Sequence, residues 1–102
     1  MMHDEELIKM VAEEFIDDMK DQVDSLEKAV QDADLENIAL HAHSIKGAAS
    51  NLGGVALSSK AYNMEKAGKA GDLETVVASM PELIKAYEAL MKAVQQKLFT
   101  EN

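Results

Sequence analysis

The sequence predicts an all-α protein folded as an antiparallel up-down four-helix bundle. Its 102 residues include one proline, five glycines and only 4% aromatic side chains. The abundant Ala, Leu, Glu, Lys and Met lose little side-chain freedom in a helix, so the composition favours helices throughout the chain. Apolar residues recur three or four positions apart in four segments joined by loops of about two to six residues, which is typical of antiparallel neighbours. With 47% apolar residues, the chain over residues 1–102 can bury the core of a single domain.

The first helix is predicted from about Asp4 to Gln31, because its apolar residues form one stripe and its opposite face is acidic. The stripe contains Ile8, Val11, Phe15, Met19, Val23, Leu26 and Val30. It is broad near Met10 and Val11, so a short extra N-terminal helix followed by a longer one is the alternative to one continuous helix.

The next two helices are delimited by a capping residue and by glycines. Asp34 is the predicted N-cap of the second helix, which ends at Gly53-Gly54. The buried side of this helix consists of Ile38, Ala42, Ile45, Ala49 and Leu52. A third helix is predicted from Val55 to Lys66 and ends among the glycines of AGKAGD. Its buried side consists of Leu57, Ala61 and Met64.

The fourth helix follows Asp72, which can cap it, and its apolar stripe extends from Leu73 to Leu98. Pro81 lies within this stripe. Because proline lacks the backbone donor, it either kinks the helix or starts a new one after Ser79, and we expect a kink.

The charged residues are unevenly distributed, and their balance argues against one class of function. The chain has 19 acidic residues, 10 lysines and no arginine, with a net charge of -9 and a pI of about 4.6, which argues against nucleic-acid binding. Residues 37–71 differ, because they contain four lysines and only one acidic residue, Glu65. This segment predicts a local basic surface that can accept an anion, unless the lysines merely solvate two helices.

The chain contains no cysteine, which excludes disulfides, thiolate nucleophiles and cysteine-ligated metal centres. Its acidic N-terminal segment lacks a basic region followed by an apolar run, so no signal peptide is predicted. No apolar run is long enough to span a membrane. We therefore expect a cytoplasmic protein, and its self-contained start and finish favour a free-standing protein over an excised domain.

The second helix contains the residues with the clearest chemical potential. One sector of about 100°, on the side away from the apolar stripe, contains Ala39, His43, Lys46, Gly47 and Ser50. His43 is therefore predicted to face solvent. Glycine inside a helix costs about 1 kcal/mol relative to alanine, so Gly47 suggests that a partner approaches the backbone closely there. Lys46 can neutralise an anion on the ring and, by like-charge repulsion, favours the neutral, nucleophilic imidazole.

The other two histidines are not assigned to this site. His41 lies about 200° around the helix from His43, so the two rings cannot share a site, and we expect His41 to be flanking or half-buried. His3 lies at the chain terminus and is given no role.

The segment AHSIKGAASNLGG, residues 42–54, closely resembles the signature of the histidine-containing phosphotransfer (Hpt) domain. In that signature a phospho-accepting histidine is followed by an apolar residue, Lys-Gly, small residues and a glycine that ends the helix. The resemblance covers nearly the whole chain, including DEELIKMVAEEFIDDM, the acidic turn before the histidine helix, Met64-Glu65, the AGD turn and the proline of the last helix.

By this resemblance His43 is the phosphoryl acceptor, Lys46 its charge partner and Gly47 the small residue that lets a partner's active site approach. Glu65 lies where family members usually have Glu or Gln, which makes it a hydrogen-bond neighbour of the histidine. Ser50 and Asn51 match the small and polar positions after Lys-Gly. Relatives often have an arginine on the third helix, and Lys66 is the expected substitute for it here.

The resemblance implies a phosphocarrier of a two-component phosphorelay. His43 would accept a phosphoryl group from the aspartate of a receiver domain, or from a kinase, and pass it to a response-regulator aspartate. The partners would be the receiver domain of a response regulator and a sensor or hybrid histidine kinase, with Mg²⁺ on the receiver and no cofactor or metal on this chain. No Gly-rich nucleotide loop or Walker pattern occurs, so neither an ATP site nor autonomous kinase activity is expected.

We expect a monomer that docks through the exposed faces of its second and third helices around His43. The candidate partner-binding residues are Ala39, Leu40, Ser50, Leu57, Lys60 and Lys66. For Leu57, packing in the core is the stronger interpretation.

Three other functions compete with this one. A non-catalytic helical adaptor needs the same bundle but does not explain an exposed His-Lys-Gly sector. A di-metal carboxylate bundle would use Glu-x-x-His pairs, which are absent. Phosphohistidine carriers of sugar-transport systems share the chemistry but usually have folds containing sheet, which this composition disfavours.

Overall fold

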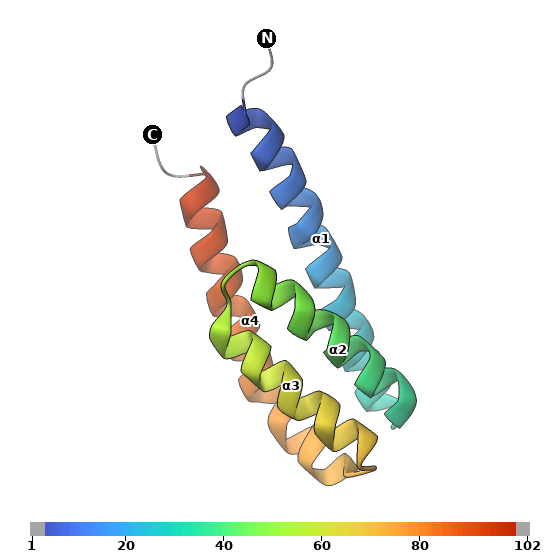
Figure 1. Cartoon of the computed structure of the whole chain (residues 1–102). Helices are drawn as coiled ribbons and strands as arrows, with labels where there is room; N and C mark the ends of the chain where they lie inside the picture. The colour runs from blue at the N-terminus through green and yellow to red at the C-terminus, as the bar shows by residue number, and fades with distance from the viewer. Residues whose placement is uncertain (1–3, 100–102) are drawn as a thin grey trace.

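The computed structural model describes residues 4–99 of the chain, with the side chains of residues 10–96. The elements in chain order are the four helices α1 (Asp4–Gln31), α2 (Leu35–Asn51), α3 (Val55–Lys69) and α4 (Leu73–Phe99). Successive helices alternate in direction, and residues 4–99 contain no strand (Figure 1). The predicted all-α, antiparallel up-down four-helix bundle is confirmed.

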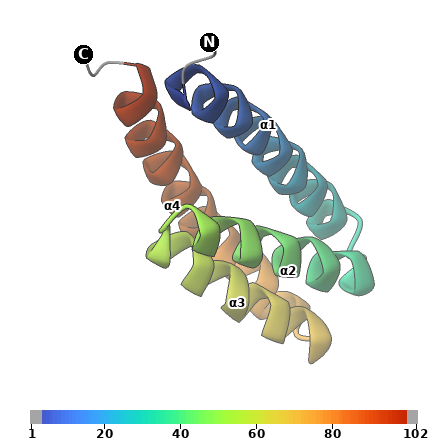
Figure 2. The same ribbon diagram turned by 45° about the horizontal axis from the view of Figure 1, so that its top comes forward.

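The first and last helices, α1 and α4, are much longer than α2 and α3, which gives the molecule its elongated shape of 52 × 20 × 18 Å. α2 and α3 lie side by side, α1 packs against α2, and α4 packs against α3. The first half of α1 and the last half of α4 extend beyond the α2–α3 pair toward the same end of the molecule (Figures 1 and 2). All four helices therefore surround a common core only along part of the length of α1 and α4.

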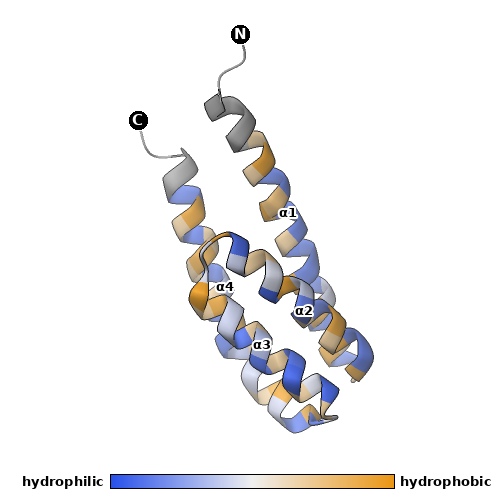
Figure 3. Cartoon of the chain, viewed as in Figure 1, coloured by the Kyte–Doolittle hydropathy of each residue, from blue (hydrophilic) through white to orange (hydrophobic). Residues whose placement is uncertain are grey.

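The core is formed by one face of each helix, as the spacing of apolar residues requires (Figure 3). Its buried apolar side chains are Met19, Val23, Leu26, Ala29, Ile38, Ala42, Ile45, Ala49, Leu57, Ala61, Met64, Ala67, Val76, Leu83 and Met91. The predicted buried sides of α2 and α3 are confirmed except for Leu52, which is half-buried. On α1, Val11 is 54% exposed although the stripe placed it inside. Val11 is exposed because the first half of α1 extends past α2. Ile8, also in the predicted stripe, has its side chain outside the described residues.

The first three helices end in the same way, with a residue of positive φ directly after the last turn. These residues are Ala33 (φ 55°), Gly53 (φ 74°) and Gly71 (φ 74°). In each case the next backbone N–H donates to a carbonyl five residues earlier: Asp34 to Ala29, Gly54 to Ala49 and Asp72 to Ala67. This pattern is a Schellman motif, which satisfies carbonyls that the helix end would leave unpaired.

The beginning of α2 also agrees with the sequence. The Asp34 carboxylate accepts a hydrogen bond from the backbone N–H of Asn37 at 3.3 Å, so Asp34 is the N-cap, as predicted. α1 is one continuous helix, so the alternative of a separate short N-terminal helix is wrong for residues 4–31. α4 likewise continues through Pro81 without a new start.

The end of α3 differs from the prediction. The helix continues one turn past Lys66, to Lys69, and includes Gly68. A Cβ at Gly68 would lie 3.2 Å from Ile38 Cγ2 and 3.3 Å from the Ala39 backbone nitrogen. Gly68 therefore allows α3 to approach α2 closely, and the glycine that terminates the helix is Gly71, whose positive φ favours glycine.

The helix ends give a matched pair of stability predictions. Ala33→Gly should raise the free energy of unfolding by about 1 kcal/mol, because only glycine adopts positive φ without strain. Gly71→Ala should lower it by about 1 kcal/mol, since a Cβ there meets no atom within 4 Å and only the backbone strain remains. Urea unfolding measures both, and a loss of stability in Ala33→Gly would contradict this account of the α1 end.

Candidate functional site

His43 lies in the middle of α2, on the side away from the core. Its neighbours Ala42 and Ile45 are fully buried, whereas the His43 side chain is 64% exposed. The helical period thus positions the ring at the surface of α2, as the sequence predicts.

The His43 ring is held by a carboxylate from the neighbouring helix. His43 Nδ1 lies 3.0 Å from Oε2 of Glu65, on α3. Glu65 is only 4% exposed, so the carboxylate lies beneath the ring between the two helices. An ionised carboxylate can only accept, so in the neutral ring Nδ1 is the protonated nitrogen and donates to Glu65. The free lone pair then resides on Nε2, on the other side of the ring, which makes Nε2 the nucleophilic nitrogen.

Two lysines contact the same carboxylate. Lys46 Nζ lies 3.1 Å from Glu65 Oε1, and Lys69 Nζ lies 3.0 Å from Oε2. Oε1 is buried and has no hydrogen-bond donor among the described residues, so its contact with Lys46 is an ion pair and not a directed hydrogen bond. Glu65, predicted as a neighbour of His43, therefore contacts three charged or titratable side chains: His43 and Lys46 of α2 and Lys69 of α3.

The pKa of Glu65 reflects two opposed effects. Burial of the carboxyl acts to raise its pKa, but the surrounding Lys69, Lys46 and His43 side chains outweigh burial and lower it from 4.5 to about 2. Glu65 is therefore ionised throughout the physiological range of pH, as an acceptor for the Nδ1–H of His43 must be.

The lysine that α3 contributes to this cluster is not the one expected. Lys66 was the predicted substitute for the family's arginine, but its ammonium lies 5.1 Å from the centre of the Tyr62 ring. Lys69 pairs with Glu65 instead. The helical spacing of four residues between Glu65 and Lys69 was available as a signal, because such pairs lie on one face of a helix.

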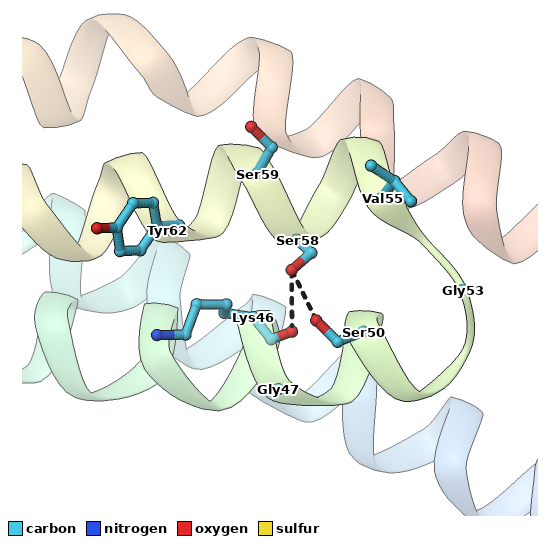
Figure 4. A pocket seen from close by; sticks show the side chains of 8 residues that line it. All are labelled: Lys46, Gly47, Ser50, Gly53, Val55, Ser58, Ser59 and Tyr62. Atoms are coloured by element: carbon cyan, nitrogen blue, oxygen red, sulfur yellow. Dashed lines mark hydrogen bonds between the residues drawn. The ribbon is translucent and has the colours of Figure 1, made fainter.

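A groove extends from the site along α2 toward the α2–α3 turn (Figure 4). Its lining residues are Lys46, Gly47, Ser50, Gly53, Val55, Ser58, Ser59 and Tyr62. Ser50 Oγ lies 2.8 Å from Ser58 Oγ, and the Ser58 hydroxyl donates to the Lys46 carbonyl at 3.3 Å, which ties the two walls together. A Cβ at Gly47 would meet no atom within 4 Å, so nothing inside the molecule requires glycine there.

A second hollow lies on the other side of His43. It is lined by Glu36, Asn37, Ala39, Leu40, His43, Glu65 and Lys69. Leu40, one of these lining residues, is 58% exposed and lies beside the charged cluster. His43 therefore stands between two hollows, each with an exposed apolar or aromatic side chain at its edge: Leu40 in one and Tyr62 in the other.

The remaining predicted partner-binding residues are distributed differently. Ala39, Leu40 and Ser50 line the two hollows, while the Lys60 ammonium pairs with Glu82 of α4 at 2.9 Å and so is directed away from α2. Leu57 is only 1% exposed and lies in the core, so its assignment to a partner surface is wrong. Leu57 lies on the face of α3 that points into the core, as the core interpretation required.

Tyr62 is a site residue that the sequence reasoning missed. Its side chain lines the groove, and the Lys46 ammonium lies 5.3 Å from the centre of its ring, within the range of a cation–π contact. In Figure 4 the Lys46 side chain extends along the groove beside this ring. The signal was the position of Tyr62 three residues before Glu65, on the same face of α3.

His41 is separate from this site, as the helical geometry predicts. It is half-buried, and its Nδ1 lies 2.9 Å from Gln22 Oε1 of α1. Among the side chains that the structure describes, no group of three His, Asp or Glu residues is placed to hold a metal ion. None of the helices in residues 4–99 is long and apolar enough to cross a membrane.

Comparison with known protein families agrees with this geometry. The family model of the Hpt domain matches residues 10–97, which is most of the chain. The chain belongs to the Hpt domain family. Hpt domains are helical bundles that serve as phosphocarriers in phosphorelays, not as kinases, and they interact with receiver domains and kinases. No curated protein and no solved structure matched the chain.

The lowered pKa of Glu65 predicts how stability depends on pH. In the unfolded chain Glu65 binds a proton near pH 4.5, whereas in the folded protein it stays ionised down to about 2. The stabilisation that comes from its ionised form is therefore fully present above pH 4.5 and is lost as the pH falls through about 2. Urea unfolding between pH 7 and pH 2.5 should show wild type losing more stability than Glu65→Gln, and parallel curves would contradict this.

Proposed function

We propose that this Hpt domain accepts a phosphoryl group on Nε2 of His43 from a receiver-domain aspartate or a kinase, and passes it to a response-regulator aspartate. The observation that supports this most directly is the hydrogen bond between Nδ1 of the exposed His43 ring and the buried Glu65 carboxylate. That bond selects the tautomer whose free lone pair lies on Nε2.

The transfer can be written with its atoms and charges balanced. The Nε2 lone pair attacks the phosphorus of an aspartyl phosphate, the N–P bond forms, and the P–O bond breaks with its electron pair left on the aspartate carboxylate. The proton stays on Nδ1, so the phosphorylated ring becomes cationic. The ionised Glu65, at 3.0 Å from Nδ1, stabilises that positive charge in the way that a carboxylate supports a catalytic histidine.

Lys46 is proposed to neutralise the phosphoryl oxygens. Its ammonium lies on the Glu65 carboxylate next to His43, and its flexible side chain starts one helical turn after the histidine. Transfer of a phosphoryl group depends mainly on positioning and on charge neutralisation. The partner would supply the aspartate and its Mg²⁺, and we expect no cofactor on this chain.

The docking surface is proposed to comprise the two hollows on either side of His43. A receiver domain is a transient partner, so we expect a small contact with apolar groups near its centre. Leu40 and Tyr62 are exposed at the edges of the hollows, and Gly47 leaves the backbone of α2 open between them. We further propose that the protein acts as a monomer in the cytoplasm.

The decisive experiment is intact-mass measurement after incubation with phosphoramidate, a small phosphoryl donor. Wild type should gain one phosphoryl group that acid removes, because phosphohistidine is acid-labile. His43→Gln should gain none, and His41→Gln, which alters the separate contact with Gln22, should behave as wild type. A folded wild type that stays unmodified by phosphoramidate and by phosphorylated receivers would favour the non-catalytic helical adaptor. Labelling on His41 would refute the assignment of His43.

Substitutions at Gly47 separate access by a partner from folding. Gly47→Ala should raise the free energy of unfolding by about 0.5–1 kcal/mol, because the position is inside a helix and a Cβ meets no atom within 4 Å. Gly47→Gln should slow transfer from a phosphorylated receiver at least tenfold, and more than it slows transfer from phosphoramidate. Equal losses with the two donors would contradict a role in partner access.

A further inference from the structure

The cluster around His43 contains one more positive charge than its own carboxylate needs. Glu65 supplies a single negative charge, yet it pairs with two ammonium groups, Lys46 at 3.1 Å and Lys69 at 3.0 Å. Before any phosphoryl group is bound, the three charged side chains therefore sum to +1. A phosphoryl group brings up to two negative charges at neutral pH, so the excess positive charge offsets part of the charge that the site would receive.

A single lysine could not serve both anions. If Lys46 alone balanced Glu65, its movement to an incoming phosphoryl group, before the N–P bond makes the ring cationic, would leave a buried carboxylate without a cation, which is strongly unfavourable in a protein interior. Lys69 removes this conflict, because it approaches the same carboxylate from the next turn of α3 and contacts the other oxygen.

The contacts of the two lysines also differ in a way that fits an exchange. Lys46 pairs with an oxygen that has no hydrogen-bond donor among the described residues, and its ammonium also lies 5.3 Å from the centre of the Tyr62 ring. Lys69 pairs with Oε2, the oxygen that accepts from His43 Nδ1. Lys46 is therefore the cation that can leave without disturbing the bond that orients the ring.

We propose that Lys69 is a positioning residue that keeps the Glu65 carboxylate paired while Lys46 moves from Glu65 to the phosphoryl group that is being transferred to His43. The inference rests on the proposed phosphotransfer function. Lys69 acts through Glu65 and does not contact the phosphoryl group, which distinguishes it from Lys46.

The test measures the rate at which phosphoramidate phosphorylates the whole protein, by intact mass. Lys69→Gln should reduce this rate about tenfold, an effect within the range of interaction energies between contacting charged residues. Lys69→Arg, which keeps the positive charge, should restore most of the rate. Lys28→Gln is the matched control, because it removes a similarly exposed lysine of α1 from an i, i+4 ion pair with Asp32, just after the end of that helix. It should react at the wild-type rate.

The same measurement in a Glu65→Gln background identifies the route of the effect. If Lys69 acts through the carboxylate, Lys69→Gln should cause no further loss there. A full tenfold loss in that background would mean that Lys69 contacts the phosphoryl group directly, and would overturn the proposal. A wild-type rate for Lys69→Gln would also overturn it while leaving the proposed function intact. Failure of wild type to react with any donor would instead remove the proposed function, and this inference with it.

Discussion

The contact between α2 and α3 through the buried Glu65 carboxylate is the interaction on which the site depends. It joins the histidine of one helix to the lysine of the other and fixes which ring nitrogen is protonated. A buried ion pair is weak evidence for stability, because an apolar side chain of similar size is often at least as stabilising. Glu65 is the only polar residue among the buried residues that the structure describes, and its presence is better explained by its effect on His43 than by a contribution to folding.

That contact needs two helices at close range and in a defined register. Gly68 permits the close range, since a Cβ there would press against Ile38 and the Ala39 backbone. The apolar contacts of α2 and α3 with α1 and α4 then hold the pair in place. Substituting Gly68 would therefore act on the site at a distance, by separating the helix that holds His43 from the helix that holds Glu65.

Sequence reasoning succeeded where the decisive information is local to one helix. The period of α2 gives the exposure of His43, and Asp34 and Gly53 mark the ends of the helix through capping chemistry. It failed where the outcome depends on a neighbouring helix. The third helix was ended at the glycines that include Gly68 because the packing of Gly68 against α2 has no local signature. The pairing of Lys69 with Glu65 was missed because the reach of a lysine on α3 depends on how that helix faces α2. Val11 was placed inside because helix length relative to its neighbours cannot be derived from the period.

The exposure of the site is consistent with the proposed carrier, whose reaction with a receiver domain would be helped when the docked partner covers the site. With 64% of the His43 side chain in solvent, water screens the charges of Lys46 and of any bound phosphoryl group, so their attraction is weak in the free protein. A receiver domain that covers the two hollows would exclude this water and strengthen the same contacts. The open backbone at Gly47 allows such a close approach, and the buried Glu65 already holds the ring in the required tautomer. In the proposed transfer, this chain would supply a prepared nucleophile, and its partner would supply the metal ion and the exclusion of water.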